Sequence, residues 1–191
     1  MNMNMKKTSK LLTSTAYFSL LMLQASFGYA VQTCNDATIA TTPTTDFTVH
    51  ANGTVTHKKT GLMWKVCSEG QTWDSANGSC GGVATFNFSW DQALKSPETL
   101  NNNGGYPSTN GFDDWRLPNV KELKFIVEQQ CYSPAINEAV FSNQPTNAAY
   151  WSSSPYTYYD TSAWVVNFAT GSDGFANRAT GKYVRLVRSG Q

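Results

Sequence analysis

The sequence predicts an α+β fold of small antiparallel sheets, two short helices and long loops. Three observations lead to this prediction. Strand-like segments separated by turn residues occupy residues 47–66 and 150–188, and two helix-start patterns lie between them. Strands do not alternate with helices along the chain, so the pattern does not indicate a parallel sheet.

A hairpin is the first element that the sequence predicts. Residues 47–49 and 55–57 are strand-like and flank Asn52-Gly53, a pair that tolerates positive φ and closes two-residue hairpins. After a second turn, the mostly apolar residues 62–66 predict a more buried strand.

The first helix is predicted from a capping-box pattern. Ser89 and Gln92 have the spacing at which the two side chains bond to each other's backbone N–H groups. We expect this helix to end at Pro97, because proline interrupts helices. Residues 98–112 are rich in Asn, Gly and Ser and are expected to form a surface loop.

A second capping-box pattern, Asn119 with Glu122, opens the helix that the sequence supports best. Apolar residues then recur at helical spacing as far as Cys131. Strand-like segments follow, separated by turns rich in Gly and Asp, as in a β-meander. They comprise residues 150–153, 164–169 and 183–188.

The first thirty residues have the features of a secretory signal peptide. Three lysines precede an apolar stretch, residues 11–27, that ends in Gly28-Tyr29-Ala30. We expect cleavage after Ala30, which leaves residues 31–191 as a single domain. Ser, Thr and Gln interrupt the apolar stretch, so a membrane anchor is the weaker interpretation. The protein is therefore predicted to be secreted, either periplasmic or extracellular at the cell surface, with no membrane span in the mature chain.

The composition limits the classes of partner. Only 14% of the residues are charged, against about 25% in average proteins. Removal of a leader with three lysines and no acidic residue leaves 11 basic and 13 acidic residues, a formal charge of −2. A general nucleic-acid footprint is therefore absent, and no nucleic-acid partner is expected. A surface rich in Asn, Ser, Thr and Tyr suits contact with sugars or proteins.

Four cysteines follow the leader, and an even number in an exported chain predicts two disulfides. Of the three possible connectivities, Cys67–Cys80 across a short hydrophilic loop and Cys34–Cys131 are favoured. Residues 31–46 lack apolar periodicity and are expected to be an extended lead-in held by Cys34. A zinc site is a weak alternative, because neither histidine lies near a Cys-x-x-Cys pair.

Four segments in order carry a family resemblance: TGLMW at 60–64, DWRLPNVKEL at 114–123, YWSSS at 150–154 and YVRLVR at 183–188. They resemble the family named after the C-terminal domain of a Legionella collagen-like adhesin, from about Phe47 to Arg188. That family is grouped with the C-type lectin-like fold. The resemblance implies chain ends close together on a small antiparallel sheet, two helices and a long irregular loop region that binds ligands.

Most motif residues have a structural interpretation. The tryptophans are large apolar anchors that we expect in the core, and the arginines are expected to be held by carboxylates such as Asp114 or Glu122. The motifs therefore mark the fold rather than the site. The residues concerned are Trp64, Trp115, Trp151, Arg116, Arg185 and Arg188.

The sequence does not predict an enzyme. Both histidines lie in the first hairpin, and the chain has neither a Gly-x-Ser-x-Gly elbow nor a His/Glu metal pair at helical spacing. Formylglycine-generating enzymes share the fold that the resemblance implies, but they use a pair of cysteines late in the chain. No cysteine follows Cys131 here, so that activity is not carried over and no cofactor is expected.

Calcium-dependent sugar binding is also not expected. C-type lectins use a carbonyl-and-carboxylate tripeptide and a Trp-Asn-Asp strand, where this chain has Gln-Pro-Thr at 144–146 and Tyr-Trp-Ser at 150–152. Calcium takes six to eight oxygen ligands, including several carboxylates, and only Asp113 and Asp114 are adjacent acids. A weak site at this pair stays open, and no metal is predicted.

The candidate binding residues lie in the C-terminal loops. Tyr and Asn combine rigid contact area with adaptable hydrogen bonds, as in antibody loops. The alternative is that these are ordinary solvated loop residues. The family's adhesin member binds sulfated polysaccharide, so the resemblance implies that Arg178 and Lys182 meet sulfate or carboxylate groups. The full set is Tyr156, Tyr158, Tyr159, Asp160, Ser162, Asn177, Arg178 and Lys182.

Two functions of different class follow. The first is an exported, non-catalytic, adhesin-like binding module that recognises a glycan or a surface protein. The second is a structural or accessory subunit of a cell-surface assembly, in which the tyrosines are buried against a partner. The sequence leaves oligomerisation open.

Overall fold

The computed structural model describes residues 31–102, 111–145 and 149–190, so the expected signal peptide lies outside the described residues. Two larger antiparallel sheets dominate, with strand orders β11-β4-β3-β2 and β10-β9-β8, and two small ones pair β1 with β7 and β5 with β6. The strands are β1 Thr33–Cys34, β2 Phe47–Val49, β3 Thr54–His57, β4 Leu62–Lys65, β5 Thr72–Asp74, β6 Ser79–Gly81, β7 Cys131–Tyr132, β8 Ala149–Pro155, β9 Ser162–Asn167, β10 Ser172–Asn177 and β11 Val187–Ser189. The helices are α1 Trp90–Asn102, α2 Val120–Lys124 and a 3₁₀ turn, Thr44–Asp46.

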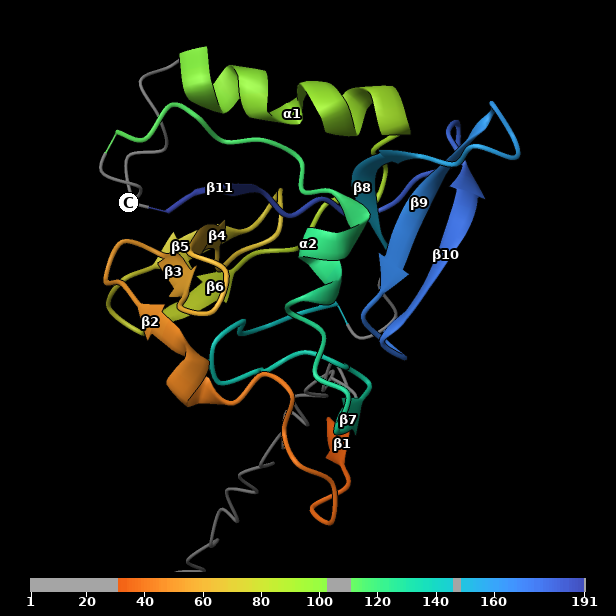
Figure 1. The fold of residues 1–191 in the computed structure, drawn as a ribbon. Coiled ribbons are helices and arrows are strands. Elements are labelled where there is room, and N and C mark those ends of the chain that lie inside the picture. Colours follow the sequence, from red (N-terminus) through yellow and green to blue (C-terminus); the bar gives the residue numbers. More distant parts are fainter. Residues whose placement is uncertain (1–30, 103–110, 146–148, 191) are drawn as a thin grey trace, which may run out of the picture.

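The arrangement confirms the α+β prediction at this coarse level. In Figure 1, α1 lies across the top of the molecule, β1 and β7 lie at the opposite end, and the sheet of β8, β9 and β10 stands to one side. The last strand, β11, returns to pair with β4 of the first hairpin region. The beginning and the end of the motif-bearing region therefore share one sheet.

The first hairpin forms, but its connection is longer than predicted. Strands β2 and β3 pair antiparallel, and residues 50–53 connect them, whereas the sequence predicted a two-residue loop. Gly53 has φ +79°, and a Cβ at this position would lie 2.5 Å from Cγ of Trp73. Glycine is needed here both for the backbone conformation and for the close approach of the indole ring.

Two core clusters lie on opposite faces of the same strands. The first includes Trp64 and Val166, and the second includes Met63 and Val165. Successive strand residues point to opposite faces, so each strand supplies both clusters. Residues of α2 and the segment after it belong to the first cluster, and residues of α1 and the 115–117 segment belong to the second.

The first helix does not end at Pro97, so that prediction is wrong. The Ser89–Gln92 capping box forms, but α1 continues through Pro97 to Asn102. Proline has no N–H for the carbonyl of Ala93, and the Ser96 hydroxyl donates a hydrogen bond to that carbonyl at 2.9 Å instead. The proline ring is buried, and residues 98–102, expected as a loop, are helical. Residues 103–110 of that expected loop lie outside the described residues.

The second helix is shorter than predicted. Its capping box is complete, with Asn119 accepting from the Glu122 N–H and Glu122 accepting from the Asn119 N–H. The helix ends at Lys124 instead of Cys131, because the chain after it pairs elsewhere. Val127 forms a β-bridge with Ile136, which buries the apolar residues of this segment without a helix.

Both predicted disulfides form. Cys34–Cys131 joins β1 to β7, and Cys67–Cys80 closes a loop that contains the β5–β6 hairpin, which the sequence did not predict. The lead-in is also held by Glu128, whose carboxylate accepts from the backbone and hydroxyl groups of Thr41 and Thr42 at 2.8–3.1 Å. Burial opposes ionisation of Glu128, but the hydrogen bonds from Gln130, Thr41 and Thr42 outweigh it and lower its pKa.

The three motif tryptophans are buried, as predicted. Two of the three arginines are held by the predicted carboxylates, Arg116 by Glu122 and Arg188 by Asp114.

Arg185 has a different environment, and the prediction of a carboxylate partner is wrong. Its fully buried guanidinium donates to the carbonyl oxygens of Lys65 and Val66, to Oγ of Ser68 and to Oε1 of Gln144. Backbone carbonyls at the end of β4 point inward here and surround the cation with partial negative charge. Burial lowers the pKa of Arg185.

Candidate functional site

Five aromatic side chains gather on one face of the β8-β9-β10 sheet, and we call this surface the aromatic ledge. The β8–β9 loop, residues 156–161, projects at the upper right of Figure 1 and supplies three of the rings. The other two come from β9 and β10. The ledge consists of Tyr156, Tyr158, Tyr159, Trp164 and Phe175.

Tyr156 is the centre of the ledge. Its ring stacks on Phe175 with centroids 4.2 Å apart and planes 13° apart, and meets Trp164 edge-on at 5.0 Å. The rings of Tyr158 and Tyr159 lie 5.7 Å and 5.9 Å from the same ring. Offset and edge-to-face pairs at such distances are the arrangements that aromatic quadrupoles favour.

The backbone explains why these rings share a face. Phe175 pairs directly with Trp164 across the β9–β10 ladder, and directly opposed residues point the same way. The N–H of Tyr156 donates to the Ser162 carbonyl at 3.1 Å, and the Ser162 N–H donates to the Tyr159 carbonyl at 3.0 Å. These two bonds close the loop and hold its tyrosines beside the strand pair.

Three of the five ledge rings are exposed to solvent. Tyr158 is 83% exposed, Tyr159 57% and Phe175 49%. Contiguous aromatic surface of this kind has a hydration cost that favours contact with a ligand.

The remaining candidate residues in this region have different environments. Asp160 is exposed on the same loop as the tyrosines. Ser162 is buried, and its carbonyl accepts from Tyr156 as described above. The side chain of Asn177 accepts from the Ala179 N–H at 2.9 Å and so shapes the turn after β10.

The two candidate cations lie on the other side of the sheet. Ala176 of β10 packs with the second core cluster, and Arg178 follows it on the same side, with its guanidinium 4.2 Å from the Trp90 ring. The Lys182 ammonium lies 5.9 Å from the Trp151 ring, which belongs to the same cluster. Burial lowers the pKa of Lys182. The structure therefore brings the three tyrosines together but separates Arg178 and Lys182 from them.

Sequence reasoning did not include Trp164 and Phe175 in the site. Trp164 was visible as one member of an alternating strand pattern. Phe175 lies in a short Gly-containing segment, and only the register that pairs it with Trp164 shows that it belongs to the ledge. Two strand segments with aromatic residues on both sides of a tyrosine-rich loop are the signal that could have suggested the pairing.

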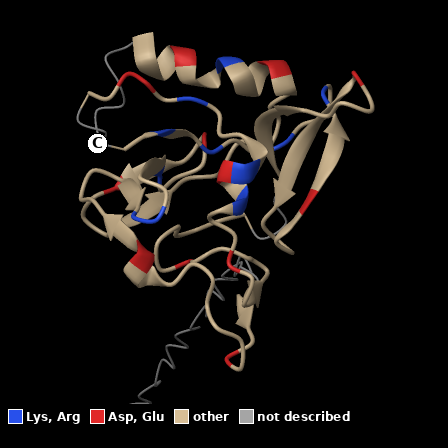
Figure 2. Cartoon of the chain, viewed as in Figure 1, with Lys and Arg blue, Asp and Glu red and all other residues tan. Residues whose placement is uncertain are grey.

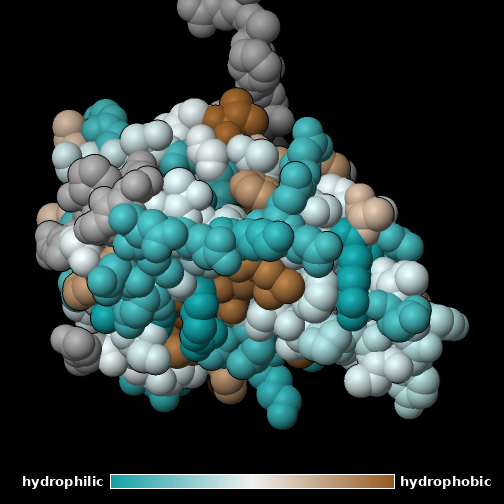
Figure 3. Space-filling model, turned by 90° about the horizontal axis from the view of Figure 1, so that it is seen from above, coloured by the Kyte–Doolittle hydropathy of each residue, from teal (hydrophilic) through white to brown (hydrophobic). Residues whose placement is uncertain are grey.

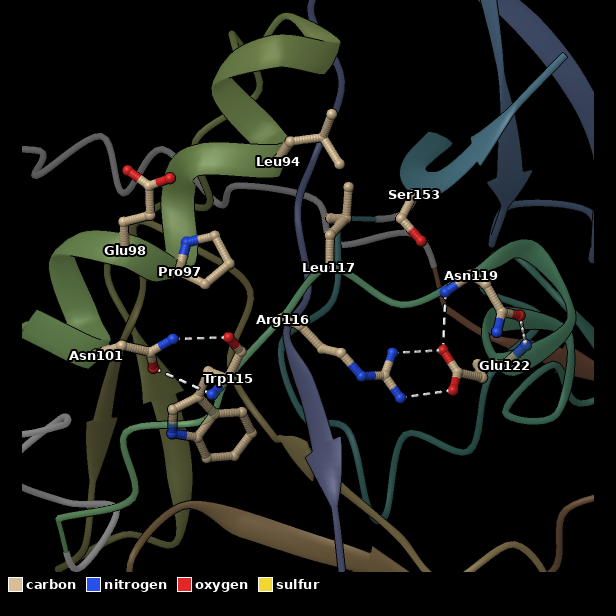
Figure 4. Close-up of a pocket in the computed structure, with 10 residues that line it drawn as sticks. All are labelled: Leu94, Pro97, Glu98, Asn101, Trp115, Arg116, Leu117, Asn119, Glu122 and Ser153. Atoms are coloured by element: carbon tan, nitrogen blue, oxygen red, sulfur yellow. Dashed lines mark hydrogen bonds and ion pairs between the residues drawn. The ribbon is translucent and has the colours of Figure 1, made fainter.

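A second candidate site is a groove of about 430 Å³ beside α1. Leu94, Pro97 and Leu117 form its apolar wall, and the motif residues Arg116 and Glu122 lie along its other side (Figure 4). Seen from above, the face that carries α1 is mostly polar, with hydrophobic surface recessed among the polar side chains (Figure 3).

Several polar groups of the groove are bonded to one another. Arg116 and Glu122 form a bidentate pair with distances of 2.8 Å and 2.7 Å. The Asn101 amide donates to the Trp115 carbonyl and accepts from the Trp115 N–H. These bonds connect α1 to the DWRLPNVKEL motif at 114–123, which we call the motif segment (Figure 4). Hydrogen bonds from Arg116 and from the Asn119 backbone outweigh burial and lower the pKa of Glu122. These groups stabilise the segment and leave few free to act on a ligand.

A comparison with known protein families shows which family the sequence belongs to. The sequence model of the Lcl C-terminal domain matches residues 53–188. The chain belongs to the Lcl C-terminal domain family. No curated protein matches the chain.

The match to the Lcl C-terminal domain includes the aromatic ledge, the groove and the Cys67–Cys80 disulfide. It begins after β1 and β2, so the Cys34 side of the second disulfide is outside the matched span. Within this Lcl domain, the motif segment lies between the two larger sheets. The backbone of Arg116 forms an antiparallel β-bridge with Val187 of β11. The Pro118 carbonyl accepts a hydrogen bond from the Ser153 N–H of β8.

The acidic residues of this Lcl domain do not assemble a metal site in the part of the chain that the structure describes. No group of three or more His, Cys, Asp or Glu side chains is placed to hold a metal ion there. The Asp114 carboxylate is bound by the Arg188 guanidinium, with Oδ1 2.5 Å from Nε. Of the two adjacent acids that the sequence left open as a weak calcium site, Asp113 and Asp114, the second is therefore bound to an arginine.

Proposed function

We propose that this Lcl domain is an exported, non-catalytic, lectin-like module that binds a glycan on the aromatic ledge. The exposure of the stacked rings is the observation that carries the proposal. A pyranose ring has one face of C–H groups, and packing it on an aromatic ring removes apolar area of both from water. The tyrosine hydroxyls at the rim and the nearby Asp160 supply partners for sugar hydroxyls.

Export is part of the proposal, and the two disulfides support it, because such bonds persist in oxidising compartments. In the described part of the chain, neither helix is long and apolar enough to span a bilayer. The C-type lectin-like fold is also proposed, supported by the sheet that joins β2, β3 and β4 to the returning strand β11.

The absence of catalysis is proposed on the chemistry of the residues. His57 is buried against Phe47, and its Nδ1 lies 2.9 Å from the Thr60 hydroxyl. Burial lowers the pKa of His57 and favours its neutral form. Of the three charged residues that line the groove, Arg116 and Glu122 are bonded to each other, and Glu98 is exposed on α1. Such groups serve packing and capping rather than proton transfer.

The test is a glycan array probed with the exported chain and with two variants. We expect the wild-type chain to bind a subset of glycans and the double variant Tyr158→Ala/Tyr159→Ala to lose at least tenfold in affinity. Tyr132→Ala is the matched control, because Tyr132 is 55% exposed, much like Tyr159, but lies on β7 at the other end of the molecule. Equal losses in both variants would contradict the proposal.

The second candidate is a structural or accessory subunit whose ledge is covered by another protein. The high exposure of three ledge aromatics also fits this function, since tyrosines are common anchors of protein interfaces. A chain that is isolated only in a complex, with Tyr158 protected from iodination, would favour the second candidate over the glycan-binding module.

A further inference from the structure

Charge is distributed unevenly over the β8-β9-β10 sheet. The β8–β9 loop carries one charged residue, Asp160, and β10 carries one, Asp173 (Figure 2). Asp173 pairs with Val166, which belongs to the first core cluster, and this places it on the ledge face. Lys124 of α2 reaches the same face, and its ammonium lies 2.6 Å from the Asp173 carboxylate, so the two charges neutralise each other. The net charge that the loop and β10 bring to the ledge is therefore that of Asp160.

The cations that an anionic ligand would need are engaged elsewhere. Arg178 lies over Trp90, and its Nε donates to the Ser162 carbonyl at 3.1 Å. The Lys182 ammonium donates to the Gly181 carbonyl at 3.1 Å, between the Phe86 and Trp151 rings. Among the described residues, no lysine or arginine lies over a ring of the ledge, and this includes the exposed Lys121 of α2.

The polar groups beside the rings match uncharged sugars. An ionised carboxylate accepts hydrogen bonds and donates none, so Asp160 suits sugar hydroxyls and repels sulfate or carboxylate groups. The neighbouring Thr157 and Thr161 are exposed and offer hydroxyls that donate and accept. Repulsion by Asp160 acts over roughly the Debye length, about 8 Å at physiological salt, and Asp160 directly follows Tyr159 in the chain.

We propose that the aromatic ledge selects uncharged glycans and discriminates against sulfated or carboxylated ones. This inference rests on the proposed glycan-binding function and names its ligand class. Stacking supplies the attraction, and the Asp160 carboxylate supplies the discrimination against anionic sugars.

The test uses polysaccharides in matched pairs that differ in sulfation. Native gels are cast with dextran or dextran sulfate, hydroxyethyl cellulose or cellulose sulfate, and agarose or carrageenan, and the retardation of the exported chain gives the affinity. We expect the uncharged member of at least one pair to bind at least tenfold more tightly at low salt. Added salt should narrow the difference, because it screens the repulsion.

Two variants assign the effect to the ledge. Tyr158→Ala/Tyr159→Ala should remove retardation by the uncharged polymer. Asp160→Asn should raise the affinity for the sulfated partner about threefold or more, whereas Asp36→Asn, which removes the same charge from the exposed lead-in, should not.

The two proposals fail in different ways. If the sulfated polymers bound more tightly than the uncharged ones, and this binding required the tyrosines, the proposed selectivity would be wrong. The proposed glycan-binding function would still hold. Retardation by none of the six polymers, with the wild-type chain folded, would count against both. Retardation that survives the double tyrosine variant would show that the ledge is not the site.

Discussion

The aromatic ledge and the groove beside α1 both contain aromatic and charged residues, but these residues are exposed on the ledge and are bonded within the fold in the groove. In the groove, Trp115 is buried, and the Asn101 side chain forms hydrogen bonds with its backbone N–H and carbonyl. Arg116 and Glu122 form an ion pair there. On the ledge, Tyr158 and Tyr159 contact the ring of Tyr156 and remain exposed. A recognisable motif can therefore consist of residues whose bonding is satisfied within the fold, and a binding surface is better sought where side chains lack such partners.

Truncation of the groove tryptophan should give the largest effect. Trp115→Ala removes a buried ring from the second core cluster and should reduce the free energy of unfolding by about 3–5 kcal/mol. Urea denaturation followed by circular dichroism measures this change. Trp73→Ala, at a partly exposed ring, is the control and should cost less. A Trp115 variant as stable as the wild type would show that the groove segment is not part of the core.

Removal of the groove carboxylate should have a smaller effect. Glu122→Ala loses the capping box and the pair with the half-exposed Arg116, and should cost about 1–2 kcal/mol at neutral pH. Glu122→Gln keeps an acceptor for the cap and should cost less.

The same carboxylate has a defined pH dependence. The folded-state pKa of Glu122 lies below its ordinary value of 4.5, so its contribution is present above that value and is lost as the pH falls below it. Thermal melts between pH 7 and pH 3 should therefore show a smaller acid destabilisation in Glu122→Gln than in the wild type. Parallel curves for the two proteins would contradict this role.

The ledge should show the reverse relation between stability and binding. Tyr158→Ala and Tyr159→Ala should each change the free energy of unfolding by no more than about 0.5 kcal/mol, because both rings are on the surface. The double variant should nevertheless lose the binding measured on the glycan array. Unfolding of this variant, with Trp115→Ala remaining stable, would reverse the assignment of core and site.

Chelation should have no effect on either region. Two carboxylates lie near the described rings of the ledge, Asp160 and Asp173; Lys124 binds Asp173, and calcium requires several carboxylates. We expect EDTA to leave the melting temperature and glycan binding unchanged. A loss of binding that added Ca²⁺ restores would indicate a site at Asp113 and its neighbours.

Local rules in the sequence predicted much of the fold. The hairpin around Gly53, both capping boxes and the burial of Trp115 follow from turn chemistry, helix-end bonding and side-chain size. Both disulfides followed from parity and loop length. These features depend on neighbours in the sequence or on residue type alone.

The predictions that were wrong or incomplete depend on contacts between distant segments. The second helix ends early because Val127 pairs with Ile136, and Arg185 is held by backbone carbonyls far away in the chain. For the site, the tyrosines were identified from composition, but Phe175 required the register of β10 against β9. Arg178 contacts Trp90 at the start of α1, which no local pattern indicates.

The buried Arg185 also determines the order in which the fold can be completed. Its partners Lys65 and Val66 precede it by 120 and 119 residues, so their inward-facing carbonyls stay hydrated until the segment that carries Arg185 has been made. Contacts of such long range slow folding. In a chain that is made from its N-terminus, these bonds at the end of β4 can therefore form only late in synthesis. Export, which is part of the proposed function, requires such a loosely structured chain during passage through a secretion channel.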